Sequence, residues 1–235
     1  FIEIDRDELD NHNTSLFDKN FGNALTAISL SHFYAYKKIA ESYDSALIFE
    51  DDVILSDNFM VKLTKYINEL PADFDILSIG NGCNLHISKN EIQSNKHIYK
   101  RENNNEVFIR CTDSYIVSKK CALFLCEYIN NSAKNINRAI DNWLDIVVRD
   151  NNLITYWAEP TIVTQASQTG LFDRSWYEQK QLCNNFIDFN NNFKKLSSSD
   201  FLENLYNSNC NILENLKFYF GINNKQIDIT NIVIE

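Results

Sequence analysis

The sequence predicts an α/β fold, a sheet whose two faces are covered by helices. Amphipathic helical patterns alternate with short, continuous apolar runs, and such runs are typical of strands buried on both faces. The 235 residues are 44% hydrophobic and 23% charged, which is ordinary for a globular chain and excludes disordered and collagen-like architectures. No run approaches the roughly 18 apolar residues of a membrane-spanning helix.

The elements can be justified in chain order. A helix is predicted over 24–40, where apolar side chains recur every three or four positions around His32. The apolar run at 46–49 predicts a buried strand. The remaining predictions are a helix at 58–70 after an N-cap at Ser56 or Asp57, a strand at 74–79 closed by a turn at 80–82, a polar surface excursion at 83–105, strands at 106–110 and 115–117, helices at 119–130 and 137–150, and strands at 153–157 and 161–164.

Two regions are predicted. Residues 1–178 are expected to form one domain, and residues 179–235 an Asn-rich helical appendage with helical patterns near 200–206 and 212–219. We expect the appendage to pack on the sheet or to cover an interface in a homo-oligomer. Because the chain begins with Phe1 rather than Met, we also expect that a further N-terminal segment precedes it.

Charge and cysteine content exclude several classes of partner. There are 22 Lys and Arg against 32 Asp and Glu, a formal net charge of −10. Binding to a nucleic acid or to an anionic membrane needs clustered basic residues, so neither partner is expected. The 6 Cys have neither a Cys-x-x-Cys pair nor zinc-finger spacing. Scattered thiols of this kind favour a reducing compartment such as the cytoplasm over the secretory lumen.

The acidic triplet Glu50-Asp51-Asp52 follows the predicted strand at 46–49 directly. Ligands of open α/β sheets bind beyond the carboxyl ends of the strands, so three carboxylates stand where a ligand is expected. Grouped like charges are unfavourable unless a cation neutralises them, and Mg²⁺ or Mn²⁺ bridging to a phosphate would do so. The alternative is a solvated acidic turn, but the buried strand before it favours a ligand site.

Five segments of the chain carry a further signal, and they are LSHFYAYKKIAESYDSALIFEDDVIL (30–55), FDILSIG (74–80), CTDSYIVSKKCALFL (111–125), AIDNWLDIVV (139–148) and YWAEPTIVTQASQ (156–168). In this order they resemble motifs of glycosyltransferase family 25, which includes lipopolysaccharide and lipooligosaccharide glycosyltransferases and collagen β-galactosyltransferase domains. The resemblance extends over about residues 20–175 and implies a GT-A fold, a UDP-hexose donor, a DxD-like site for Mn²⁺ or Mg²⁺, and inversion at the anomeric carbon.

The chain departs from the family pattern at its front. The family usually opens with an apolar strand and a basic helix, which do not precede residue 21 here. Its acidic Gly-Glu-x-Gly-Cys element reads FGNALTA at 21–27, without the Glu or the Cys. The missing strand and helix normally supply part of the nucleotide pocket, so donor binding is the property that this departure affects.

The resemblance also implies roles for single residues. Asp52 and Glu50 are expected to bind the metal, with Asp51 beside them in the donor site. Asp141 is expected to be the base that deprotonates the acceptor hydroxyl; the alternative is a carboxylate that stabilises a helix N-terminus. Asp145, one turn later, is interpreted as a solvated carboxylate whose charge would raise the pKa of Asp141. The other expected donor-site residues are Ser31, His32, Thr112, Asp113, Tyr115 and Gln165, with a core role as the alternative for His32 and Tyr115.

Three functions compete at this point. The first is a metal-dependent glycosyltransferase that acts on a glycan or a hydroxylated-peptide acceptor. The second is a catalytically silent relative that binds a glycan or a protein, which the altered front motivates. The third is a glycoside hydrolase with paired carboxylates such as Glu50 and Asp141. The first should bind UDP only with a divalent cation, the second should ignore both, and the third should act without nucleotide or metal.

Overall fold

The computed structural model describes residues 2, 4–82, 85–88, 90–102, 107–132, 136–165 and 233–234. Apart from its last two described residues, the predicted appendage at 179–235, with the helical patterns at 200–206 and 212–219, lies outside the described residues. Within the described ranges, no helix combines the length and the apolar character needed to cross a membrane.

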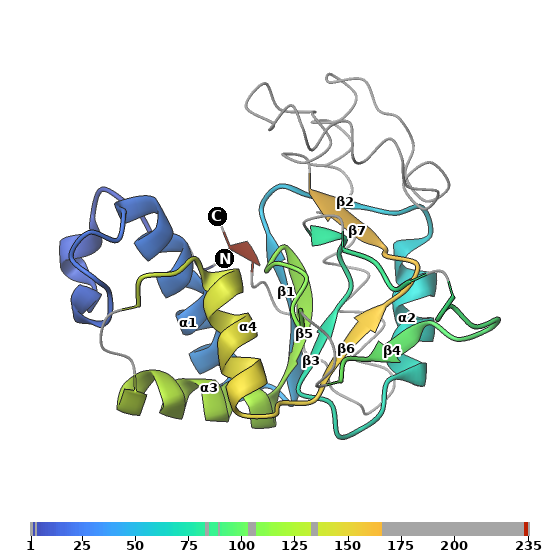
Figure 1. Cartoon of the computed structure of the whole chain (residues 1–235). Helices are drawn as coiled ribbons and strands as arrows, with labels where there is room; N and C mark the ends of the chain where they lie inside the picture. Colours follow the sequence, from blue (N-terminus) through green and yellow to red (C-terminus); the bar gives the residue numbers. More distant parts are fainter. Residues whose placement is uncertain are drawn as a thin grey trace, which may run out of the picture.

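A six-stranded mixed sheet forms the centre of the molecule (Figure 1). Its strand order is β4-β6-β3-β5-β1-β8. β1, β3, β6 and β8 run in one direction, and β4 and β5 run in the other. β2 and β7 form a separate antiparallel pair. The strands are β1 (Ser45–Glu50), β2 (Val53–Leu55), β3 (Ile76–Ser78), β4 (Ile98–Lys100), β5 (Ser114–Ser118), β6 (Thr155–Ala158), β7 (Val163–Gln165) and β8 (Val233–Ile234).

Helices cover both faces of the sheet, which confirms the predicted fold class. α1, α3 and α4 bury their apolar sides in one core cluster and α2 in another. The sequence of β1 is continuously apolar because its side chains are buried on both faces of the sheet. Ala46 and Ile48 belong to the first cluster, whereas Leu47 and Phe49 belong to the second. The helices are α1 (Asn23–Ser42), α2 (Phe59–Glu69), α3 (Lys119–Ser132) and α4 (Ile140–Asp150), preceded by two 3₁₀ turns, η1 (Leu9–Asn11) and η2 (Thr14–Leu16).

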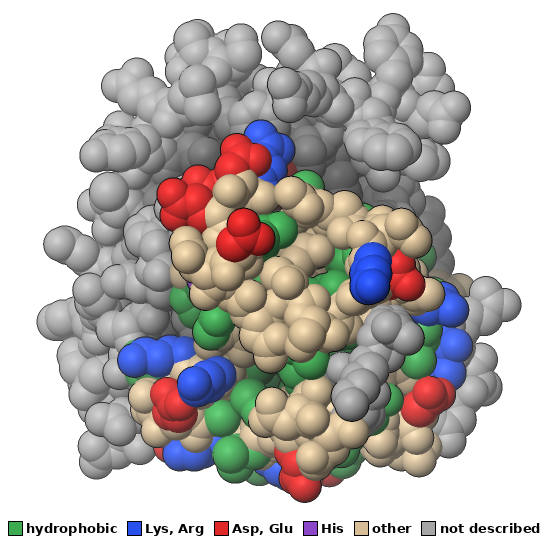
Figure 2. Space-filling view, turned by 90° about the vertical axis from the view of Figure 1, so that its left-hand side faces the viewer, with side chains coloured by type: hydrophobic (Ala, Val, Ile, Leu, Met, Phe, Trp, Pro, Cys, Tyr) green, Lys and Arg blue, Asp and Glu red, His purple; other side chains and the backbone are tan. Residues whose placement is uncertain are grey.

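Figure 2 looks onto the side of the molecule where the N-terminal segment and the α1–α3–α4 layer lie. Acidic side chains gather in the upper part of this face, and Lys and Arg side chains are spread among them and below. Hydrophobic side chains also reach this surface. Leu25 of α1 and Leu123 of α3 are among the exposed large apolar residues of the chain.

Most predicted elements are confirmed, with shifted ends. α2 does not begin after Ser56 or Asp57. Its N-cap is Asn58, which has a left-handed backbone with φ 56°, a conformation that Asn tolerates better than most residues. α4 begins at Ile140 after an N-cap at Ala139, three residues later than predicted. The confirmed elements are α1 for 24–40, β1 for 46–49, β3 for 74–79, β5 for 115–117, α3 for 119–130, β6 for 153–157 and β7 for 161–164.

Three predictions are wrong or incomplete. The segment 107–110, expected to be a strand, is irregular. The amides of Phe108 and Ile109 donate to Oδ1 of Asp145, at 2.7 and 3.0 Å, instead of to a neighbouring strand. The excursion at 83–105 contains β4, which pairs with β6. β2 was not predicted, because its three residues lie between the acidic triplet and the polar residues at 56–58 and show no alternating pattern.

Candidate active site

The candidate site lies where β1, β3 and β6 end, at the upper end of the sheet in Figure 1. β5 runs in the opposite direction, and Ser114 at its start is the partner of Phe49 near the end of β1. The main-chain amide of Glu50 donates to the carbonyl of Asp113 at 2.9 Å. The topology therefore brings the acidic triplet beside the segment that precedes β5.

Glu50 is held by hydrogen-bond donors from two distant parts of the chain, and a histidine from a third part lies near it. Thr112 Oγ1 donates to Oε1 at 2.9 Å and Gln165 Nε2 donates to Oε2 at 2.9 Å. His32 Nε2 lies 3.7 Å from Oε1. The hydroxyl and the amide are uncharged, so they orient the carboxylate of Glu50 without neutralising it. Four residues that the sequence assigned to the donor or metal site are thus brought together.

The other two carboxylates of the triplet continue this acidic surface. Gln165 Nε2 also lies 3.4 Å from Oδ1 of Asp52, which ties Asp52 to the group around Glu50. The pKa of Asp51 is raised, first because its carboxyl loses part of its water and then because the negative charges of Asp52 and Glu50 are close. The triplet therefore concentrates negative charge at the end of β1.

Asp113 adds a fourth carboxylate, and it is buried. Only 1% of the residue is exposed. Oδ2 accepts from Ser114 Oγ at 2.9 Å, whereas Oδ1 has no hydrogen-bond partner among the described residues. Burial raises the pKa of Asp113 well above its ordinary value, and the charges of Glu50 and Asp52 raise it further. Such an oxygen is what a cation or a hydroxyl donor of a ligand would satisfy.

Two glycines allow the chain to approach Asp113. A Cβ on Gly80 would lie 1.9 Å from Oδ2 of Asp113, and a Cβ on Gly82 would lie 2.8 Å from Oδ1. The sequence predicted a turn at 80–82; the structure supplies a steric reason for the two glycines. Asn81 between them is buried, and its Oδ1 has no hydrogen-bond partner among the described residues.

A buried chain of side chains lies behind Glu50. His32 Nδ1 and the hydroxyl of Tyr115 are 2.6 Å apart, and the hydroxyls of Tyr115 and Tyr36 are 2.9 Å apart. All three residues are 0% exposed. His32 and Tyr115 therefore lie in the core, which was the alternative to a direct contact with the donor. Ser31 is also buried, and its hydroxyl donates to the carbonyl of Ala27 in its own helix. Tyr36 has the pattern of an ordinary core residue of α1, so the sequence did not single it out.

Asp141 lies in the first turn of α4, and its Oδ1 accepts from the main-chain and side-chain nitrogens of Asn142. α4 begins at the same upper end of the molecule at which β1 ends (Figure 1). Asp145 is not the solvated carboxylate that the sequence suggested. Its Oδ1 accepts the two amides described above, and its Oδ2 lies 2.7 Å from Nη2 of Arg149, so its charge is offset locally.

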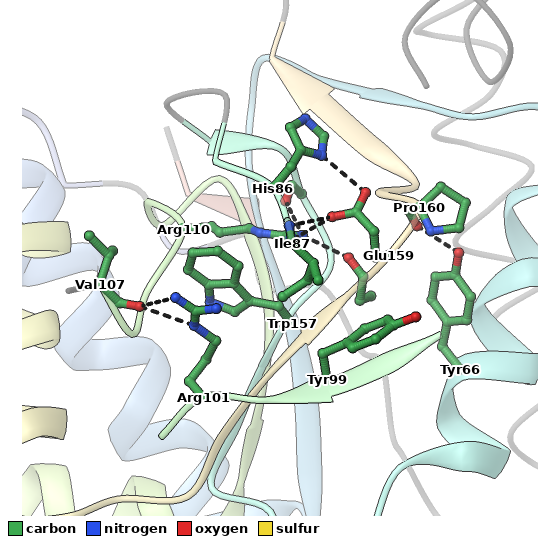
Figure 3. A network of polar contacts seen from close by, with 12 residues as sticks. Tyr66, His86, Ile87, Tyr99, Arg101, Val107, Arg110, Trp157, Glu159 and Pro160 are labelled. Atoms are coloured by element: carbon green, nitrogen blue, oxygen red, sulfur yellow. Dashed lines mark hydrogen bonds and ion pairs between the residues drawn. The ribbon is translucent and has the colours of Figure 1, made fainter. Parts of the chain in front are cut away.

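A second polar network, which sequence reasoning missed, lies at the end of β6 (Figure 3). The guanidinium of Arg110 is fully buried, with Nη2 2.7 Å from Oε2 of Glu159. Nη1 donates to the carbonyl of Ala158 at 2.7 Å. Glu159 also accepts from the amide of Ile87 at 3.2 Å and lies 3.0 Å from Nδ1 of His86. The network joins the segment before β5 and the end of β6 to the segment that follows β3.

The charges of this network compensate each other. Burial acts to raise the pKa of Glu159, but the hydrogen bond with His86 and the charge of Arg110 outweigh it and lower the pKa to about 2. Burial lowers the pKa of Arg110 to about 10, which still leaves the guanidinium charged. Arg110 lies over the ring of Trp157 at 4.3 Å, and Arg101 does so at 3.7 Å. A signal was present in the sequence, since Glu159 follows an apolar strand just as Glu50 does.

The donor set restricts how a metal ion could be held. In the part of the chain that the structure describes, no three His, Cys, Asp or Glu side chains are arranged as metal ligands. Mg²⁺ is commonly held by one or two carboxylates together with phosphate oxygens of the substrate and water. Glu50 and Asp52, with the unpartnered oxygen of Asp113 near them, suit a cation bound in that way.

Comparison with protein families gives one match. A model described as glycosyltransferase family 25 (LPS biosynthesis protein) matches residues 5–144, more than half of the chain. The matched region contains the acidic triplet, Asp113 and Asp141, whereas Glu159 and Gln165 lie beyond it. No curated protein matches the chain in a direct sequence comparison.

Proposed function

The chain belongs to glycosyltransferase family 25 and is a glycosyltransferase, and from this premise we propose that it transfers galactose or glucose from a UDP-sugar to a hydroxyl group of a glycan or hydroxylated-peptide acceptor. The domain is of the GT-A type, the reaction inverts the anomeric carbon, and Mn²⁺ or Mg²⁺ assists it. The family's description as an LPS biosynthesis protein supports a glycan as the acceptor.

The observation that carries this proposal is the cluster of carboxylates formed by Glu50, Asp52 and Asp113 at the end of β1. Among the described residues, neither Glu50 nor Asp113 forms an ion pair with a lysine or an arginine. Glu50 and Asp52 would hold the cation, with Asp113 close to it. When bound, the cation acts as a Lewis acid that neutralises the negative charge of the departing diphosphate.

Asp141 serves as the general base. Its carboxylate accepts the proton of the acceptor hydroxyl while the hydroxyl oxygen forms a bond to the anomeric carbon. The bond between that carbon and the diphosphate oxygen breaks, and UDP leaves with the electron pair. The position of Asp141 in the first turn of α4, at the end of the molecule where β1 terminates, supports this role.

The donor site is tested by thermal unfolding with UDP, Mn²⁺, both or neither. A ligand at a hundredfold excess over its Kd stabilises the folded state by about 2.7 kcal/mol. We expect a shift that needs both ligands and disappears in Asp52→Ala. Asp73→Ala is the matched control, because Asp73 is an exposed carboxylate just before β3, at the opposite end of the sheet. No shift of the wild type under any condition would contradict the proposal and favour a silent binding module.

The catalytic base is tested by sugar transfer from UDP-galactose and UDP-glucose. Asp141→Asn should keep the ligand-dependent thermal shift and lose about 10²- to 10⁴-fold in the rate of transfer, the usual contribution of a general base. If Asp141→Asn transferred sugar at the wild-type rate, Asp141 would be a helix-terminal carboxylate only.

A further inference from the structure

We propose that Tyr115 is a positioning residue that fixes His32 in the neutral tautomer with its proton on Nε2, so that His32 presents an N–H group to Glu50. Tyr36 orients the hydroxyl of Tyr115 for this purpose. The consequence for donor binding rests on the proposed glycosyl transfer, whereas the tautomer itself is a property of the free protein.

The first step of the argument is the isolation of this chain from water. His32, Tyr36 and Tyr115 are all 0% exposed, and consecutive polar atoms are 2.6 and 2.9 Å apart. Burial raises the pKa of both tyrosines, so both hydroxyls keep their protons. The ring of His32 also stacks on that of Tyr115, with centroids 5.8 Å apart, which restricts rotation of the imidazole.

The second step is a count of protons. Each hydroxyl donates one hydrogen bond. In the described part of the chain, the hydroxyl of Tyr36 is hydrogen-bonded to that of Tyr115. We therefore infer that Tyr36 donates its hydroxyl proton to the oxygen of Tyr115. The proton of Tyr115 is then directed at Nδ1 of His32. Nδ1 must be the acceptor, and a neutral imidazole therefore carries its proton on Nε2.

The third step is the position of Nε2. This atom is buried and has no hydrogen-bond partner among the described residues, and the nearest carboxylate oxygen, Oε1 of Glu50, is 3.7 Å away. The tautomer derived above directs the N–H toward that oxygen. The other tautomer would direct a lone pair at a carboxylate, which is unfavourable. Polar contacts in unliganded sites are often long and shorten when the substrate binds.

His32 thus completes the set of donors around Glu50. Thr112 and His32 both face Oε1, whereas Gln165 holds Oε2 and also approaches Asp52. Oε2 of Glu50 and Oδ1 of Asp52 therefore lie near the same donor, Nε2 of Gln165. Residues that orient a metal ligand in this way change metal affinity by about 10- to 100-fold when they are replaced.

The tautomer is measured by ¹⁵N NMR of protein labelled at histidine, because the ¹⁵N shifts of Nδ1 and Nε2 report which ring nitrogen carries the proton. The chain has 4 His, and His32→Gln identifies the signals of His32. We expect an unprotonated Nδ1 and a protonated Nε2 in the wild type, and a shift toward the other tautomer in Tyr115→Phe. A protonated Nδ1 in the wild type, or a tautomer unchanged in Tyr115→Phe, would overturn the proposal.

Tyr66→Phe is the matched control. Tyr66 is 2% exposed, and its hydroxyl donates to the carbonyl of Pro160 at 2.6 Å, but it belongs to α2 on the other face of the sheet. Tyr66→Phe also removes the hydroxyl of a buried tyrosine, so its loss of stability should be comparable to that of Tyr115→Phe. The tautomer of His32 should not change in Tyr66→Phe. If Tyr115→Phe does not fold, the wild-type spectrum still decides the tautomer.

The consequence for the donor site is measured by calorimetric titration of UDP in the presence of Mn²⁺. Tyr115→Phe should weaken binding by about tenfold or more relative to Tyr66→Phe. Equal affinities of the two variants would overturn the positioning role. If the wild type showed the expected tautomer but bound no UDP, the proposed function would fail while the assignment of His32 stood.

Discussion

Glu50 and Glu159 occupy equivalent places at the ends of β1 and β6 in one sheet, and they are treated in opposite ways. Glu159 is paired with the buried guanidinium of Arg110 and with His86. Glu50 receives a hydroxyl from Thr112 and an amide from Gln165. Both carboxylates are well hydrogen-bonded, but among the described residues only Glu159 of the two is paired with an arginine or a lysine.

The difference between the two carboxylates is one of charge compensation. A low pKa of about 2 shows that the surroundings of Glu159 favour its charged form. Near Glu50 the pKa of Asp113 and of Asp51 is raised instead, first by burial and then by the negative charges of their neighbours. Among the described residues, Glu159 at the end of β6 is paired with a guanidinium, whereas no lysine or arginine pairs with Glu50 at the end of β1. Charge compensation, rather than hydrogen bonding, therefore distinguishes the two ends.

The largest effect is expected at Arg110. Arg110→Met leaves Glu159 buried without its guanidinium partner, and removal of one member of a buried ion pair costs about 3–5 kcal/mol. Arg101→Met is the control, because Arg101 also lies over Trp157 but its hydrogen bonds go to the carbonyl of Val107. Urea unfolding should show a clearly smaller loss for Arg101→Met. Equal losses would mean that stacking on Trp157, not charge pairing, dominates at the end of β6.

Glu159→Gln tests the same pairing through its pH dependence. The folded pKa of about 2 lies below the reference value of 4.5. The corresponding stabilisation of about 3 kcal/mol is present above pH 4.5 and is lost as the pH falls through 2. At pH 7, Glu159→Gln should lose this amount in urea unfolding, with the difference from wild type shrinking below pH 4.5. Glu50→Gln should cost less than about 1 kcal/mol, because its donors are uncharged; an equal loss there would remove the contrast between the two carboxylates.

Gly80→Ala tests the close approach to Asp113. The added Cβ would meet Oδ2 of Asp113 at 1.9 Å and Oγ of Ser114 at 2.3 Å. Overpacking of this kind costs about 1–3 kcal/mol, to be measured by chemical denaturation. Gly22→Ala should change stability by less than about 0.5 kcal/mol, since nothing lies within 4 Å of its Cβ position. A neutral Gly80→Ala would show that the segment at 80–82 can move away from Asp113.

Asp113→Asn should have the smallest effect and the opposite sign. Because the folded pKa of Asp113 is raised, ionisation opposes folding at every pH above its unfolded value near 3.8. Asparagine removes this penalty, so we expect a gain of about 0.5–2 kcal/mol at pH 7 that disappears near pH 4. Asp75→Asn provides the contrast, because Asp75 is also buried but pairs with Lys120 and accepts from the amide of Ile154. Asp75→Asn should destabilise, and a loss for Asp113→Asn would mean that its charge is compensated.

The sequence predicted the parts of the fold that depend on local pattern. Helical periodicity and continuous apolar runs identified α1, β1 and α3 because one residue's burial is correlated with that of its near neighbours. β2 and β4 have three residues each and are flanked by charged or polar residues, without a longer apolar run such as the one at 74–79 that identified β3. The segment 107–110, part of the strand expected at 106–110, is irregular because a distant side chain, Asp145, supplies an acceptor in place of a neighbouring strand.

The candidate site shows the same division. The acidic triplet was predicted from its position after a strand, and the family resemblance brought Thr112, His32 and Gln165 to it. Their roles in binding and catalysis, and that of Asp141, stay predictions. Arg110 and Glu159 were missed because they are 49 positions apart in the chain, and nothing local distinguishes a buried charged pair from two solvated side chains.

The separation of the donors around Glu50 has a consequence for folding. Thr112 is 62 positions away from Glu50, and Gln165 is 115 positions away. Closing loops of this length is entropically unfavourable and comes late when topology is dominated by distant contacts. The arrangement around Glu50 therefore exists only after the sheet has closed, and a partly folded chain has no such site. A ligand that binds there stabilises the whole closed sheet at once, so its concentration raises the free energy of unfolding of the sheet instead of ordering one loop.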